Sequence, residues 1–376
     1  MRQLGKGTLS LLDAQGADAA RWEEALAPMP GADIYFTPAW TRLFAELDGD
    51  RPLCALWEGD GGKVLFPLQL RALNRLPFWT SRWLGATAGT PAFDATSPYG
   101  YSGPLAQAED PAETPRILIQ FMDALGERLR GERVVSLFIR FHPLAGNAEY
   151  FPQETLDLGK RSETVFIDLT APWYKSLTSA CRYEIRKSER RGVTVERASG
   201  PGDWEAFGDL YRDTMTRRSA RSWYIFPQAF LEETRRLLSP AVTLLVARHE
   251  GKVAGGALFL EGFGKGHYHL SGADSGAAGL GVTNRLVVEG ARLCETHGCR
   301  VLHLGGGVGG GDGLARFKAS FSPLRARWDK ACVVTDPEAY ERLVSARAAF
   351  LAESGARDES SDAFPAYRRG WERLTR

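Results

Sequence analysis

The stretch from 242 to 272 constrains the fold of this chain more than any other: VTLLVARHEGKVAGGALFLEGFGKGHYHLSG. Three runs of strand-forming residues are separated by short segments rich in glycine and charge, which are typical of tight turns. Strands joined by tight turns pair in antiparallel order, so this stretch predicts an antiparallel meander. A predicted helix at 283–297 and a strand at 300–304 follow it.

The first half of the chain repeats this order of elements. Strand-like runs at 53–58 and 63–70 are joined by three glycines and an aspartate, which predicts a hairpin. A helix at 115–130 and a strand at 134–141 follow. The repeat lies in the order of elements more than in the residues themselves.

Length and composition suit a packed protein of two domains. The 376 residues are 44% hydrophobic and 25% charged, which is ordinary for globular proteins. We place the domains at 1–162 and 163–376, the second ending in a helical tail, with a mixed α+β or α/β arrangement. The net charge of +1 gives no global field for non-specific nucleic-acid or membrane binding, so any basic site is local.

The five cysteines and the apolar runs indicate the compartment. The cysteines are scattered, odd in number and without a CxxC pair, which argues against a disulfide framework and a structural zinc site. The first residues turn polar before a signal-peptide core forms, and no run approaches the roughly 18 apolar residues of a membrane span. These features predict a cytoplasmic protein with reduced thiols and no integral membrane segment.

Two groups of arginines are candidates for binding phosphate. A predicted helix at 173–191 carries Arg186 on a strongly cationic face, which could hold phosphates or could simply be solvated. Arg218 and Arg221 lie close to Tyr224, and arginine beside aromatic residues suits a phosphate together with a base or sugar. Aromatic residues at this spacing are also typical of a core.

The segment HYHLSG at 267–272 places His267 and His269 on one face of a strand and Tyr268 on the other. A metal site would need a third ligand, such as His303 or Asp312. An isolated HxH pattern more often marks a polar strand face, so we expect no metal.

The most unusual segment is LGGGVGGGDGLARFKASF at 304–321. Its formal GxGxxG comes late, without an N-terminal βαβ unit or the GK[ST] ending of a P-loop, which argues against a nucleotide loop. A flexible backbone close to the substrate, followed by a short helix that presents Phe317 and Lys318, is the better interpretation. A lysine held there can stabilise an oxyanion or a leaving group. Without a serine elbow or a cysteine with a fixed histidine partner, direct transfer is expected.

The sequence resembles the Fem-like aminoacyltransferases, including those that build peptidoglycan interpeptide bridges, within the GNAT acyltransferase superfamily. The resemblance implies an acyltransferase of two tandem GNAT-like domains, with the acceptor in a cleft between them and the donor bound by the second. The stretches that carry it are DATSPYGYSGPL at 94–105, CRYEIRKSERRGVTVE at 181–196, LYRDTMTRRSARSWYIF at 210–226, HYHLSG at 267–272 and LGGGVGGGDGLARFKASFSP at 304–323.

Roles for several residues follow from this resemblance. The family's phosphate-contacting arginine and tyrosine match Arg218 or Arg221 and Tyr224, and its strand tyrosine matches Tyr268. Its functional lysine falls on Lys318, next to Phe317, and is expected to stabilise the tetrahedral intermediate or the departing ribose oxygen. Further candidates are Asp94 and Asp312 as acceptors of the amine's proton, and Tyr99 and Arg186 as substrate-binding residues.

The identity of the donor stays open between two classes. Aminoacyl-tRNA is the first, with a peptidoglycan precursor or a small biosynthetic amine as the acceptor. Acyl-CoA is the second, acting on an amino sugar or another small amine, because Gly279, Gly281 and Asn284 lie where GNAT enzymes place a pyrophosphate loop. In either case the donor is a substrate and no tightly bound cofactor is expected. A non-catalytic protein that binds tRNA or anionic glycans is the third hypothesis.

Overall fold

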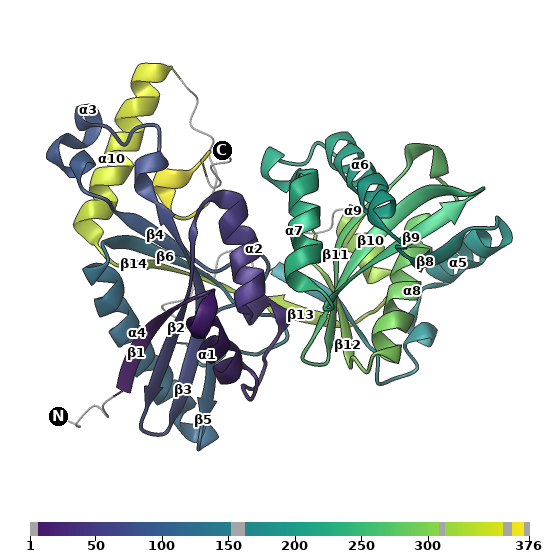
Figure 1. The fold of residues 1–376 in the computed structure, drawn as a ribbon, viewed down its shortest axis with the longest axis horizontal. Coiled ribbons are helices and arrows are strands. Elements are labelled where there is room, and N and C mark those ends of the chain that lie inside the picture. Colours follow the sequence, from purple (N-terminus) through teal and green to yellow (C-terminus); the bar gives the residue numbers. More distant parts are fainter. Residues whose placement is uncertain (1–6, 152–161, 308–312, 356–362, 372–376) are drawn as a thin grey trace. The chain divides into compact units, whose positions relative to one another are not determined.

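The computed structural model describes residues 7–151, 162–307, 313–355 and 363–371. The chain divides into two compact units, the first formed by 1–161 together with 328–376 and the second by 162–327 (Figure 1). Each unit contains its own sheet with helices packed against it, which confirms the predicted mixed α+β fold. No helix among these residues is both long and apolar enough to cross a lipid bilayer.

The first unit is built on a seven-stranded sheet in the order β1-β2-β3-β4-β6-β14, with β5 paired to β3 beside this path. The predicted hairpin is present as β2 and β3, which pair from Arg51 with Leu70 to Gly59 with Gly62. The strands are β1 (Gly7–Asp13), β2 (Arg51–Gly59), β3 (Gly62–Ala72), β4 (Phe93–Thr96), β5 (Leu105–Ala108), β6 (Val134–Arg140) and β14 (Lys330–Val334). The helices are α1 (Gly16–Leu26), α2 (Pro38–Asp48), α3 (Ser81–Leu84), α4 (Thr114–Gly131) and α10 (Pro337–Ser354).

The two faces of the first sheet have separate cores because successive strand residues point to opposite sides. On β2, Leu53 and Ala55 join a cluster with Phe121 of α4. Cys54 and Leu56, one residue along, join a second cluster with Trp22 of α1. This alternation fixes the register of the hairpin, because a slip of one residue would exchange the two faces.

The last part of the chain belongs to the first unit. The sequence-based division placed 163–376 in one domain, whereas β14 pairs antiparallel with β6, from Lys330 with Arg140 to Val334 with Ser136. The α10 residues Leu343 and Ala346 then pack with Phe78 and Val135 in a further core cluster of this unit. A strand that completes a distant sheet is a non-local pairing, which no local pattern reveals.

The second unit has a seven-stranded sheet in the order β13-β7-β12-β11-β10-β9-β8. The predicted meander is present as β9, β10 and β11, each antiparallel to the next. The strands are β7 (Ser162–Asp168), β8 (Thr194–Arg197), β9 (Val242–His249), β10 (Lys252–Gly262), β11 (Lys265–Ala273), β12 (Val301–Gly305) and β13 (Arg325–Trp328). The helices are α5 (Ser179–Arg190), α6 (Pro201–Arg217), α7 (Gln228–Leu238), α8 (Val282–Thr296) and α9 (Gly313–Ala319).

Adjacent glycines let helices approach both faces of this sheet closely. A Cβ placed on Gly255 would lie 2.7 Å from a methyl group of Val282 in α8, and one on Gly256 would lie 2.7 Å from the ring of Phe207 in α6. A Cβ on Gly272, opposite Gly256 in the ladder, would lie 2.6 Å from the backbone of α6. These residues therefore set how deeply α6 and α8 sit on β10 and β11.

The helix predicted at 173–191 is divided in the structure. A short 3₁₀ helix spans Trp173–Ser176, and α5 begins at Ser179. Thr178 separates them, because its side-chain oxygen accepts a hydrogen bond from the backbone N–H of Cys181 and caps α5. The prediction overlooked this cap inside the apolar stripe.

Candidate functional site

The parallel strands β11 and β12 pair over only three residues. Lys265, Gly266 and His267 pair with the residues from Val301 to His303, and no further pairing between the two strands is found in the described chain. β11 continues to Ala273 beyond this point. The two strands therefore part at their carboxyl ends, the edge of a sheet where ligands commonly bind in α/β folds.

Lys318 lies at the carboxyl end of β12. Its side chain is buried, 9% exposed, and its Nζ donates a hydrogen bond to the carbonyl oxygen of Gly306 at 2.6 Å. Phe317 packs against Phe321 with ring centroids 5.1 Å apart. The short helix α9 thus turns the lysine toward the sheet, as the sequence predicted. Asp312, the other candidate in this segment, lies outside the described residues.

Tyr268 occupies β11 where its pairing with β12 has ended. Its hydroxyl donates a hydrogen bond to the Oγ of Ser271 at 2.5 Å, and its ring lies 5.7 Å from that of Phe259. Burial raises the pKa of Tyr268 to about 12, although the hydrogen bond that it shares with Ser271 acts in the opposite direction. The phenol is therefore protonated at neutral pH and can act as a proton donor.

The histidines beside Tyr268 lie in the sheet interior. His267 and His303 are buried, with ring centroids 5.5 Å apart. Burial, together with the nearby His267, lowers the pKa of His269 to about 3. His269 is accordingly uncharged at neutral pH, so it adds no positive charge to the end of β11.

The turn before α8 exposes backbone amides at the start of a fifteen-residue helix. Gly279 and Gly281 have φ values of +82° and +71°, and Gly281 is the N-cap, with no side-chain capping bond. A Cβ on Gly281 would lie 2.4 Å from the carbonyl oxygen of Glu184, so α5 packs tightly against the turn. A helix start without a cap offers N–H donors and the positive end of the helix dipole to an anion.

A lysine and an asparagine flank this amide turn. The Nζ of Lys187 would lie 4.0 Å from a Cβ placed on Gly279, and it also pairs with Glu184 at 3.4 Å. Asn284 lies in the first turn of α8 and donates to the Sγ of Cys181 at 3.5 Å. Lys187 therefore adds a positive charge to the turn, whereas the side chain of Asn284 fixes α8 to α5.

The predicted arginines follow α6, whose last residue reaches the carboxyl end of β11. Arg218 and Arg221 are exposed, and the Tyr224 ring stacks on Trp223 at 3.6 Å. Arg217, the residue before Arg218, donates to the carbonyl oxygen of Ala273 at 2.8 Å. The segment contains two consecutive arginines, and only the helical phase of α6 decides which of them reaches β11.

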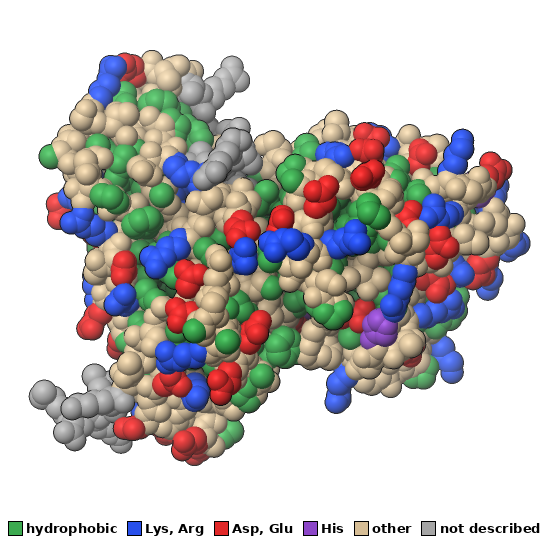
Figure 2. Space-filling model, viewed as in Figure 1, with side chains coloured by type: hydrophobic (Ala, Val, Ile, Leu, Met, Phe, Trp, Pro, Cys, Tyr) green, Lys and Arg blue, Asp and Glu red, His purple; other side chains and the backbone are tan. Residues whose placement is uncertain are grey.

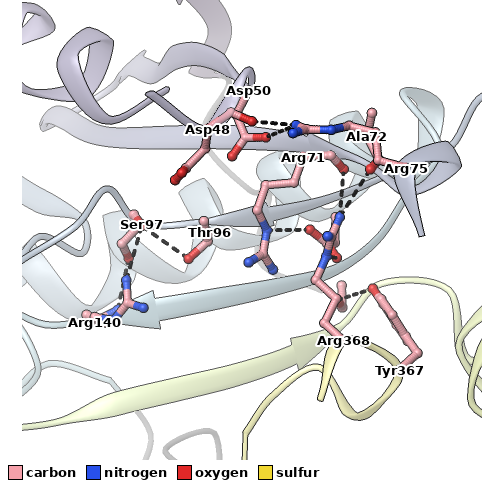
Figure 3. Close-up of polar contacts among 12 residues, drawn as sticks. Asp48, Asp50, Arg71, Ala72, Arg75, Thr96, Ser97, Arg140, Tyr367 and Arg368 are labelled. Atoms are coloured by element: carbon pink, nitrogen blue, oxygen red, sulfur yellow. Dashed lines mark hydrogen bonds and ion pairs between the residues drawn. The ribbon is translucent and has the colours of Figure 1, made fainter. Parts of the chain in front are cut away.

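Two predicted site residues, Asp94 and Tyr99, belong to the first unit. Asp94 is fully buried, and its two carboxylate oxygens accept hydrogen bonds from the Nε atoms of Arg71, at 2.6 Å, and Arg368 (Figure 3). To act as a base, Asp94 would have to give up one of these ion pairs. Tyr99 stacks on Phe44 at 4.7 Å, in the loop after β4.

Asp50 extends the buried polar network around Asp94. Its carboxylate lies 3.3 Å from Nη1 of Arg75, and Figure 3 shows this pair beside Arg71. Burial raises the pKa of Asp50 to about 7, against the opposing effect of Arg71. The network joins β3, β4 and the turn before β2 to the C-terminal segment that carries Arg368, which indicates a structural role.

In the first unit, the corresponding pair of parallel strands does not part at its carboxyl ends. Its parallel strands β4 and β6 pair up to Thr96 with Phe138, and Ser97 continues the contact. The N–H of Ser97 donates to Phe138 at 2.9 Å, and its Oγ accepts from the N–H of Arg140 at 2.9 Å. Helix α4 lies between β4 and β6 in the chain, as α8 lies between β11 and β12. It has a proline in its first turn and an acidic N-cap, Glu113. A phosphate would find fewer amides and a negative charge there.

Comparison with known proteins agrees with this geometry. Residues 175–319 match the acetyltransferase (GNAT) domain family, and no curated protein matches the chain in sequence. The fold is similar to that of FemX, with a TM-score of 0.66 and 12% identity over 87% of this chain and 98% of that one.

Two further solved structures share the fold. A tandem GNAT protein from the clavulanic acid biosynthesis pathway has a TM-score of 0.52 and 12% identity, over 88% of this chain and 99% of that one. The C-terminal domain of a putative lysylphosphatidylglycerol synthetase from Agrobacterium fabrum has a TM-score of 0.51 and 15% identity, over 89% and 95% of the two chains. At these identities the likeness shows that the fold is shared, and the family match places the GNAT domain in the second unit.

Proposed function

We propose that this chain, an acyltransferase with a GNAT domain in its second unit and the fold of FemX, transfers an aminoacyl group from aminoacyl-tRNA to an amine. The observation that carries the proposal is the contrast between the two units. Strands β11 and β12 part beside Lys318 and an amide turn, whereas β4 and β6 stay joined through Ser97. The donor therefore binds in the second unit.

Direct transfer requires three events at the donor ester. The neutral amine attacks the carbonyl carbon, the carbonyl oxygen gains negative charge, and the ribose oxygen leaves with a proton. The ammonium group of Lys318 at the end of β12 stabilises the oxyanion or the leaving oxygen. The Tyr268 hydroxyl has a pKa of about 12 and is therefore protonated at neutral pH. It supplies the proton to the departing ribose oxygen.

The cysteines support a mechanism without a covalent intermediate. Of the five, Cys54, Cys181, Cys294 and Cys299 are buried in hydrophobic clusters. Burial raises the pKa of Cys181, which accepts a hydrogen bond from Asn284 after the amide turn, so its thiolate is disfavoured. The amine must lose its proton, and Asp312 is the carboxylate proposed to accept it, because both oxygens of Asp94 are held by arginines. Activity should rise with pH until the amine is neutral.

Acyl-CoA is the second candidate donor, and one observation favours it. Gly281 begins α8 without a side-chain cap, and Lys187 lies beside the turn, an arrangement suited to a diphosphate. The acceptor in this case would be a small amine such as an amino sugar. The likeness to a tandem GNAT protein from a biosynthetic pathway supports a small acceptor for either donor.

Calorimetric titration separates the two donors. The purified protein is titrated with acetyl-CoA and with a pool of aminoacylated tRNA at low and moderate salt. We expect salt-sensitive binding of the charged tRNA, and label transfer to an amine acceptor that is lost in Lys318→Met. Stoichiometric binding of acetyl-CoA, with no response to charged tRNA, would replace the proposal with acyl-CoA transfer. Unchanged function of Lys318→Met would instead favour a non-catalytic binding protein.

A further inference from the structure

Helix α5 of the second unit presents a cationic outer face. The helix and its C-cap Arg191 contain five basic residues and two acidic ones, a balance of +3 in a chain whose total is +1. Figure 2 shows basic side chains gathered at the end of the second unit where Figure 1 places α5, with acidic ones among them. The excess of charge is thus local to this helix and its surroundings.

The exposed face of α5 combines an aromatic ring with these cations. At about 100° per residue, Tyr183, Arg186, Lys187 and Arg190 fall within one narrow arc of the helix. The Tyr183 side chain is 52% exposed, which is unusual for so large an apolar group. Its ring lies 6.0 Å from Nζ of Lys187.

The acidic residues of α5 lie beside this arc, and one of them pairs with a member of it. Glu184 pairs with Lys187 at 3.4 Å, and Glu189 pairs with Arg285 of α8. Within the part of the chain that the structure describes, Arg186 and Arg190 form no ion pair, and both are exposed. Their guanidinium groups, one helical turn apart, are available to an anionic partner.

The arc continues directly from the amide turn that is proposed to hold the donor. Lys187, at the inner edge of the arc, lies next to Gly279, and Glu184 lies against Gly281. Tyr183 and Arg190 are seven residues apart, or about 10 Å along the helix axis. A phosphate can occupy the turn beside Lys187, and Arg186 and Arg190 can take further phosphates along the helix. A polynucleotide backbone carries such a linear series of phosphates.

We infer that the outer face of α5 binds the single-stranded 3′ end of the donor tRNA, with a base stacked on Tyr183 and backbone phosphates on Arg186 and Arg190. Stacking platforms interleaved with cations are the usual means of binding single-stranded RNA without reading its sequence. The inference rests on the proposed aminoacyl-tRNA donor and names the surface that receives it.

The test is RNA binding measured apart from transfer. The probe is a fluorescent hairpin RNA with a single-stranded CCA 3′ end and no amino acid, followed by anisotropy from 50 to 200 mM salt. Arg186→Ala/Arg190→Ala should bind at least tenfold more weakly, and its salt slope should fall by about 1.4, because each single-stranded phosphate contact contributes about 0.7. Tyr183→Ala should lose roughly fivefold or more, while Tyr183→Phe keeps the stacking ring.

A matched control removes the same charge from another helix of the same unit. Arg235 and Arg236 of α7 are both exposed, and Figure 1 shows α7 on the side of the second unit away from α5. Arg235→Ala/Arg236→Ala should bind the hairpin as the wild type does. Equal binding by the α5 and α7 variants would contradict the proposal that α5 binds the RNA, and it would not affect the proposed aminoacyl-tRNA donor. If the wild-type protein does not bind the hairpin, α5 is not an RNA-binding surface. A transfer assay with charged tRNA then tests the donor proposal separately.

Discussion

The Nζ of Lys318 donates a hydrogen bond to the carbonyl oxygen of Gly306, the first residue after β12, at 2.6 Å. The lysine side chain is buried, and a buried ammonium group is retained only where its charge is compensated. The carbonyl oxygen of Gly306 meets part of this need, and the ammonium group can also stabilise an oxyanion. Replacing Lys318 should therefore slow the transfer step and leave donor binding nearly unchanged.

Lys318→Met keeps the length of the side chain and removes its charge. We expect kcat to fall by about 10² to 10³, the usual effect of losing one oxyanion donor, with donor affinity nearly unchanged. Lys252→Met, at an exposed position on β10, is the control and should keep full activity. Full activity of a folded Lys318→Met variant would remove the lysine from the mechanism.

Gly281→Ala tests the amide turn. Its φ of +71° disfavours any Cβ, and the carbonyl oxygen of Glu184 occupies the place of that Cβ. Gly298→Ala has the same backbone cost at φ +79° without a nearby atom, so it is the matched control. Gly298→Ala should lose about 1 to 2 kcal/mol of stability, and Gly281→Ala should lose more because its Cβ also meets Glu184. Only Gly281→Ala should lose donor binding by tenfold or more. Equal donor binding by the two variants would argue against an anion site in the turn.

The second unit should lose stability in mild acid through His269. The unfolded side chain takes up a proton near pH 6.5, whereas burial keeps the folded one neutral down to about pH 3. The unfolded state therefore binds more protons in this window, and the free energy of unfolding falls as the pH falls. Between pH 6.5 and 5 the loss should be about 1 to 2 kcal/mol by urea unfolding. His269→Gln should flatten this dependence, and an unchanged slope would contradict the assignment.

Arg368→Ala should destabilise the first unit. It leaves one oxygen of the buried Asp94 carboxylate without its guanidinium partner, a loss that typically costs about 3 to 5 kcal/mol. Arg342→Ala on α10 removes an exposed pair with Glu338 and should cost less than about 1 kcal/mol. Urea unfolding compares the two, and similar midpoints would show that the buried pair contributes little.

The sequence predicted what local patterns determine. The alternation on the strands, the turn glycines and the helical stripes were enough for the hairpin, the meander and the helix after it. The resemblance placed Lys318 and Tyr268 in one unit with the amide turn, and the structure describes them there. Their roles in catalysis stay predictions.

The remaining features depend on contacts between distant residues. Asp94 was proposed as a base because nothing near it in the sequence suggests that Arg368, 274 residues away, pairs with it. Arg217 could not be separated from Arg218, because the choice depends on the phase of α6 against β11. The close packing of α5 on Gly281 likewise follows from the tertiary fold. Non-local pairings of this kind leave no periodic pattern.

Because β14 and α10 return to the first sheet, the second unit is inserted within the first. During synthesis the ribosome delivers residues 162–327 in full before it delivers the strand that pairs with β6. The second unit can therefore complete its fold while the first still exposes one edge of its sheet, and an exposed edge is a site of aggregation. The half of the molecule whose translation begins first is thus the half whose fold is completed last.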